Sequence, residues 1–270
     1  MKRMSYLTAA VLLTLTSAAN AQWYISDGPA AQLYDYTQGS GAAVNPRPIA
    51  PLGATGIITG IDISATGVMY GVTTFGDNSL YSIISGSGAA TLVGPLGGNI
   101  NNIEGDIGFD PTSGILYSMW DSGSGHGLFT LNTTTGAASY VGDLSMDDPS
   151  GLSIDAAGNM WVVDSHVNTG GALTLHQVNK ATGGTISTMS MGVTINQPLL
   201  GTDFNEATGT MYMAAQNGRF YSVNTGTGLA MLVDTHNVFG ATGLAWVPEP
   251  ASILLLTVGS LAAIRRRVRG

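Results

Sequence analysis

The sequence contains no cysteine, which excludes disulfide bonds and thiol chemistry and leaves the fold dependent on its packed core. Basic residues are also scarce, because six of the nine Lys and Arg lie at the two ends of the chain. Residues 4–264 keep only Arg47, Lys180 and Arg219 against 17 acidic residues, a net charge of −14. Such a domain repels phosphate backbones and anionic lipids, so nucleic-acid binding is excluded. Its charge keeps an exported protein soluble and attracts cations.

Long apolar runs are also lacking, except near the two ends. At the start, Lys2 and Arg3 precede an apolar stretch over residues 9–15, and Ala19 and Ala21 supply the small residues of a cleavage site. This order is typical of a secretory signal peptide, which we assign to residues 1–21. We therefore expect signal peptidase to remove it and the mature chain to begin at Gln22. The apolar run is too short for a retained membrane helix.

The other apolar run covers residues 251–264 and contains no charged residue. As a helix it would be about 21 Å long against a hydrocarbon core of about 30 Å, so it predicts a marginal membrane anchor. The segment Pro248-Glu249-Pro250 precedes it, and an arginine cluster follows it, made of Arg265, Arg266, Arg267 and Arg269. Arginines stay on the cytoplasmic side, which would leave the rest of the chain outside the inner membrane.

This order of motif, apolar helix and arginine cluster over residues 248–270 resembles the PEP-CTERM sorting signal. The resemblance implies that an exosortase, an integral-membrane cysteine protease, recognises Pro248, Glu249 and Pro250 and removes the helix and arginines. It also implies a Gram-negative host that makes extracellular polysaccharide. We therefore expect a precursor tethered to the inner membrane and a product at the cell surface or outside the cell.

Residues 22–247 contain a repeated unit of four short apolar segments separated by turns that end in glycine. The second segment of each unit carries an aromatic residue, and successive aromatics are 47, 44 and 51 residues apart: Tyr70, Tyr117, Trp161 and Tyr212. Four strands in about 45 residues are typical of a β-propeller blade. Since a single blade cannot bury both of its faces, the units must stack on one another.

The two ends of this region complete one further unit. Residues 243–246 read as a first strand without a successor, whereas residues 23–25, 32–36 and 41–44 read as a second, third and fourth strand. We therefore predict an all-β propeller of five four-stranded blades, closed by pairing the N-terminal and C-terminal strands. This closure would remove an exposed sheet edge. The alternative is an open β-solenoid, which the long period and the complementary half-units disfavour.

Functional residues are expected on the loops that follow each second strand and on the loops that enter each first strand, because these share one face of a propeller. Oxygen ligands gathered there would suit Ca²⁺. The alternative is that these Asp and Asn residues only form turns, in which both residue types are common for backbone reasons. Asp–His pairs on the same loops raise the alternative of a Ca²⁺-dependent hydrolase or lactonase. The candidate residues on this face are Asp77, Asp121, His126, Asp164 and His166.

Two other sets of residues are assigned structural roles. The repeated aromatics would form a sugar-binding platform or pack between blades, and their fixed place in every repeat favours packing. Asp110, Asp155 and Asp203 are interpreted as turn formers. Taken together, the sequence predicts an exported, non-enzymatic binding or structural propeller associated with extracellular polysaccharide or biofilm.

Overall fold

A computed structural model of the chain describes residues 23–53, 56–97, 104–121, 125–166, 169–195 and 198–247, without the side chains of Glu104 and Asp121. The signal peptide, with Ala19 and Ala21, lies outside these residues, as does the whole sorting signal from Pro248 to the arginine cluster. None of the described segments forms a helix long and apolar enough to cross a membrane.

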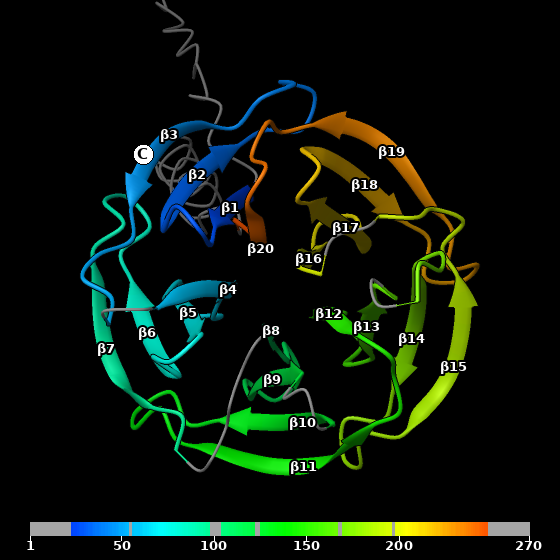
Figure 1. Cartoon of the computed structure of the whole chain (residues 1–270), viewed down its shortest axis with the longest axis horizontal. Helices are drawn as coiled ribbons and strands as arrows, with labels where there is room; N and C mark the ends of the chain where they lie inside the picture. The colour runs from blue at the N-terminus through cyan, green and yellow to red at the C-terminus, as the bar shows by residue number, and fades with distance from the viewer. Residues whose placement is uncertain are drawn as a thin grey trace, which may run out of the picture.

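The described strands form five antiparallel four-stranded sheets arranged in a ring, as Figure 1 shows. The first two blades in chain order contain β4 (Ile57–Ile63), β5 (Met69–Thr74), β6 (Ser79–Ile83) and β7 (Ala90–Pro95), then β8 (Glu104–Phe109), β9 (Leu116–Asp121), β10 (His126–Leu131) and β11 (Ala138–Leu144). The next two contain β12 (Pro149–Ile154), β13 (Met160–Asp164), β14 (Thr174–Val178) and β15 (Thr185–Ser190), then β16 (Leu200–Asn205), β17 (Thr210–Ala215), β18 (Arg219–Val223) and β19 (Ala230–Thr235).

The fifth blade joins the two ends of the propeller. It contains β20 (Ala241–Trp246), β1 (Trp23–Asp27), β2 (Gln32–Tyr36) and β3 (Val44–Pro48), in that spatial order. The C-terminal strand pairs antiparallel with the N-terminal strand, and Trp23 lies opposite Trp246. The prediction of five blades closed by pairing the terminal strands is therefore confirmed.

The hydrophobic core is divided into five clusters, and each cluster lies between two neighbouring blades. The repeated aromatics belong to these interfaces. Tyr70 packs edge-on against Phe109 of the next blade, at 5.6 Å between ring centroids, and Tyr212 packs in the same manner against Trp23 at 5.1 Å. The prediction that these aromatics pack between blades is confirmed. Burying a side chain of this size contributes about 1.5–3 kcal/mol.

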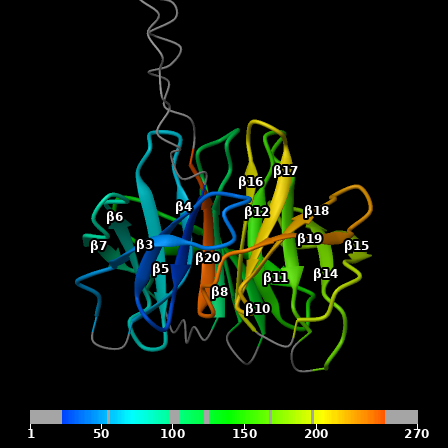
Figure 2. The same ribbon diagram turned by 90° about the horizontal axis from the view of Figure 1, so that it is seen from above.

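The innermost strands are β4, β8, β12, β16 and β20, which lie around the central axis of the ring in Figure 1. In four blades a tight turn joins the inner strand to the second strand, whereas β20 and β1 come from opposite ends of the chain. Figure 2 shows the β4–β5 and β16–β17 turns at the same face of the ring, which we call the turn face. Because the second strands run antiparallel to the inner strands, they end at the other face, which we call the loop face.

Candidate functional site

The inner strands approach one another closely around the axis of the ring, at one equivalent position in each strand. Four of the five strands carry glycine there, namely Gly60, Gly151, Gly201 and Gly243, as their register with the second strands shows. A Cβ atom on Gly201 would lie 2.3 Å from the main chain of β20, so no side chain fits. The exception is β8, where Asp106 occupies this position.

Asp106 is fully buried, and its carboxylate binds the main chain of several inner strands. It accepts hydrogen bonds from the N–H of Ile107 on its own strand, at 2.9 Å, and of Leu152 on β12, at 3.0 Å. The main chain of Thr202, on β16, interacts with it as well. Burial raises the pKa of Asp106 well above its usual range, against the opposing effect of these N–H donors. Asp106 therefore links three blades at the channel axis.

Two further carboxylates link neighbouring blades nearer the turn face. Asp62 accepts hydrogen bonds from Ile63 N–H, at 2.6 Å, and from Phe109 N–H of the next blade, at 2.5 Å. Asp203 repeats this arrangement with Phe204 N–H at 2.7 Å and Trp246 N–H at 2.6 Å. The expectation that Asp203 forms a turn is wrong, because it lies within β16 and bridges two blades. The turn after it is formed by Asn205, whose side chain accepts the N–H of Ala207.

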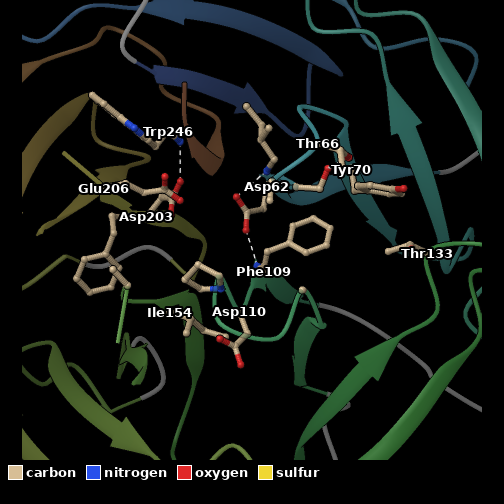
Figure 3. A pocket seen from close by; sticks show the side chains of 17 residues that line it. Asp62, Thr66, Tyr70, Phe109, Asp110, Thr133, Ile154, Asp203, Glu206 and Trp246 are labelled. Atoms are coloured by element: carbon tan, nitrogen blue, oxygen red, sulfur yellow. Dashed lines mark hydrogen bonds between the residues drawn. The ribbon is translucent and has the colours of Figure 1, made fainter. Parts of the chain in front are cut away.

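A pocket of about 550 Å³ opens beyond these two carboxylates, at the turn face. Figure 3 shows Asp203 and Glu206 next to each other, with Asp62 nearby and Asp110 further along the wall. The wall also contains aromatic rings and hydroxyl groups, contributed by Tyr70, Phe109, Phe204, Trp246, Ser64, Thr66 and Thr133. Among the described residues, the lining contains no Lys, Arg or His. The pocket is thus acidic and partly aromatic.

Burial dominates the electrostatics of this pocket. It raises the pKa of Asp62 to about 7, against the two N–H donors, and the charge of Glu206 raises it further. The pKa of Asp203 is likewise well above its usual range because of burial, and then because of the charge of Asp62. Asp110 differs, because Lys180 and nearby hydroxyl groups outweigh its burial and lower its pKa to about 2. The pocket thus contains one carboxylate, Asp110, that is paired with a lysine. The other three, Asp62, Asp203 and Glu206, have no basic partner among the described residues.

The residues predicted as a site lie at the loop face instead and are spread over three blades. The carboxylate of Asp77 accepts hydrogen bonds from Gly53 N–H at 3.1 Å, Ser79 Oγ at 3.1 Å and Tyr81 OH at 2.7 Å, so it holds its own loop together. Asp121 and His126 lie opposite each other in the register of β9 and β10.

Asp164 and His166 do lie close together, with 3.7 Å between Oδ2 and Nε2. Asp164 is almost fully buried and accepts the N–H groups of Asp147 and Asp148, at 2.9 Å each. Nε2 of His166 is 2.9 Å from the hydroxyl of Thr174, which in turn contacts His176 at 2.8 Å. This cluster stays within one blade and stabilises its loop. In the described parts of the chain, no three His, Asp or Glu side chains are placed to hold a metal ion.

The pocket carboxylates were missed because Asp62 and Asp203 lie within strands rather than loops. The repeats nevertheless contain a pattern that points to them. Asp62 and Asp203 each interrupt an apolar inner strand two residues after a glycine, Gly60 or Gly201. Asp106 replaces the glycine itself. Which main-chain groups these carboxylates bind depends on how neighbouring blades are oriented, and local sequence does not encode that.

The chain carries the PEP-CTERM protein-sorting motif, which matches residues 247–268. The fold and this motif define an exported propeller that is processed by an exosortase and carries a C-terminal membrane-anchoring signal. No curated protein matches the chain in sequence.

Solved structures resemble the fold at low sequence identity. One is a chain of a nidogen/laminin complex, with 12% identity and a TM-score of 0.52, over 78% of this chain and 77% of that one. A protein of unknown function from Bacteroides thetaiotaomicron has 15% identity and a TM-score of 0.51, over 80% of this chain and 58% of that one. A gluconolactonase from Xanthomonas campestris has 14% identity and a TM-score of 0.50, over 81% and 77%. At these identities the likeness shows the fold alone.

Proposed function

We propose that the processed protein is a non-enzymatic binding module of the cell surface or extracellular matrix, and that its ligand enters the turn-face pocket. The observation that carries this proposal is the pocket of about 550 Å³ with both aromatic and carboxylate walls. Ligand pockets usually measure about 300–1,000 Å³ and combine apolar walls with a few polar groups. Carboxylates and hydroxyls match the hydroxyl groups of a saccharide, and the aromatic rings match its apolar face. Extracellular polysaccharide is the partner that the sorting signal favours.

The role of the buried carboxylates supports binding rather than catalysis. Both oxygens of Asp62 and of Asp203 accept main-chain N–H groups, at 2.5–2.7 Å. A carboxylate held in this way positions two blades and is a poor choice for a mobile proton acceptor. The histidines of the Asp164 cluster lie at the other face, away from the pocket.

A pocket-blocking variant tests the proposal. Thr66 is exposed at the pocket rim, so Thr66→Trp should fill the mouth without disturbing the core. We expect the processed wild-type protein to bind polysaccharide purified from its own host and the variant to lose at least tenfold in affinity by calorimetry. Ala181→Trp, in an exposed turn outside the pocket lining, serves as the matched control. Equal binding by both variants would contradict the proposal.

One observation favours a hydrolase or lactonase as the second candidate. Asp62 lies in the pocket with a pKa raised to about 7, which suits a general base near neutral pH. Under this alternative, Asp62→Asn abolishes turnover of lactones or glycosides and leaves binding intact. Absence of turnover by the wild-type protein on a panel of lactones and glycosides would remove the alternative. The calcium dependence expected from the sequence finds no support here, because no three Asp, Glu or His side chains of the described residues are placed to hold a metal ion.

A further inference from the structure

The carboxylates of the pocket lack a partner of opposite charge. Asp62, Asp203 and Glu206 form no ion pair with a described residue, and the charge of Glu206 raises the pKa of both aspartates. Lys180 pairs with Asp110 of the pocket wall. Asp62 is buried and Asp203 half-buried, and carboxylates in such places are normally paired with a cation, since an isolated buried charge is costly. The pocket therefore has an unmet preference for positive charge.

The geometry leaves these groups able to bind a donor. Each oxygen of Asp62 and Asp203 accepts one main-chain N–H, and a carboxylate oxygen has a second lone pair available. Glu206 is exposed, and no described residue donates a hydrogen bond to its carboxylate. The backbone bonds fix the two aspartates in place, so a ligand does not have to order them.

The rest of the wall suits an organic cation better than a metal ion. Tyr70, Phe109 and Trp246 line the pocket beside the carboxylates, and aromatic faces attract ammonium groups within about 6 Å. A metal ion is usually held by several converging ligands, and no three Asp, Glu or His side chains of the described residues are placed to hold one. An ammonium group needs only up to three acceptors, and the carbon skeleton attached to it would contact the rings.

We propose that the pocket binds its ligand through a protonated primary amine held by Glu206 and Asp203, with Asp62 nearby. This inference rests on the proposed function, because it names the chemical class that the same pocket selects. Such an amine occurs in de-N-acetylated amino-sugar polymers and in polyamines. The two sources share the ammonium group and differ in the skeleton that the aromatic wall contacts.

Three probes distinguish these sources and isolate the charge: a glucosamine trimer, its N-acetylated counterpart and spermidine. They are titrated into the processed protein by calorimetry near pH 7, where Asp62, with its pKa of about 7, is about half ionised. The glucosamine trimer and its counterpart differ only in acetylation, so the proposal predicts at least tenfold tighter binding of the free amine. Spermidine binding as tightly as the glucosamine trimer would identify the amine as the main determinant. Much weaker binding of spermidine would show that the sugar skeleton contributes as well.

A pair of variants tests the role of Glu206. Glu206→Gln keeps the shape of the side chain and removes its charge, so it should weaken amine binding about tenfold, as expected for a hydrogen bond to a charged group. Asp155→Asn removes one negative charge at the same face outside the pocket lining and should change little. Equal effects of the two variants would overturn the proposal.

Tighter binding of the acetylated trimer would overturn it and leave the proposed function intact. If no probe binds, the proposal fails, and the Thr66→Trp assay on polysaccharide decides the proposed function separately.

Discussion

Asp203, on the inner strand of one blade, accepts the main-chain N–H of Trp246 on the inner strand of the next blade, at 2.6 Å. Asp62 makes the equivalent bond to Phe109 N–H across another blade boundary. The inner strands of neighbouring blades do not pair with one another as a sheet. The N–H groups on their unpaired edges, such as those of Phe109 and Trp246, therefore need other acceptors. Carboxylates on the inner strands supply them. The same groups that close the ring therefore also give the pocket its charge.

Asp106 offers the clearest test of this role in stability. Asp106→Ala would leave the buried N–H groups of Ile107 and Leu152 without an acceptor, and each such group costs about 1–3 kcal/mol. We expect the free energy of unfolding to fall by about 3 kcal/mol or more, measured by urea denaturation. Asp155→Ala removes the acceptor of a half-exposed turn, where water can replace it, and should cost only about 1–2 kcal/mol. Equal losses in the two variants would show that Asp106 does not link the blades.

The ring architecture could be predicted from the sequence, whereas the location of the pocket could not. The period of the aromatics, such as Tyr117 and Trp161, and the half-units at residues 23–44 and 243–246 determine the five blades and their closure. The pocket depends on residues that local patterns assign to structure. Asp and Asn form turns at both faces for backbone reasons, so their presence at Asp77 or Asp164 does not distinguish one face from the other. The binding partners of Asp62 and Asp203 lie on the next blade, more than 40 residues away.

The glycines at the close approach of the inner strands predict that no larger residue is tolerated there. Gly201→Ala would place a Cβ 2.3 Å from the main chain of Gly243 and Leu244, which requires β16 and β20 to move apart. Overpacking of this kind typically costs about 1–3 kcal/mol, and here it would also strain the Asp203–Trp246 bond. We expect a decrease in Tm of several degrees by calorimetry. Gly86→Ala is the matched control, because a Cβ there meets no atom within 4 Å. A Gly201→Ala variant as stable as the control would contradict the close approach.

Asp62 predicts an unusual pH dependence of stability. Its pKa in the folded protein is raised from an ordinary value of 3.8 to about 7, mainly because of burial. Between about pH 4 and pH 7 the unfolded chain has lost this proton and the folded chain retains it. Raising the pH across this window therefore lowers the free energy of unfolding, by about 1.4 kcal/mol for each pH unit in the limit of an isolated group. The raised pKa values of Asp106 and Asp203 act in the same direction.

A difference measurement isolates Asp62 from histidines with the opposite effect. Burial lowers the pKa of His176, and that of His236 to about 4, so these residues destabilise the fold as the pH falls below 6.5. The stability of wild type relative to Asp62→Asn should decrease from pH 4 to pH 7.5, as measured by urea denaturation at each pH. Thr66→Ala changes a residue of the same pocket that has no titratable group. Its free energy of unfolding should differ from that of wild type by the same amount at every pH. A constant difference for Asp62→Asn as well would exclude a raised pKa.

The position of Trp246 predicts that processing uncovers the pocket. Trp246 lines the pocket at the turn face, and the apolar segment of the sorting signal begins at residue 251, five residues later. Five extended residues span at most about 18 Å, so the anchored precursor must hold its pocket mouth close to the membrane. A polymer should therefore reach the pocket only after cleavage.

We expect a precursor with Pro248 and Pro250 replaced by Ala to stay in spheroplast membranes and bind polysaccharide far more weakly than the released protein. Inserting about 20 Gly/Ser residues after Val247 adds roughly 25 Å of reach and should restore binding without cleavage. Equal polymer binding by the short and extended precursors would show that the membrane does not cover the pocket.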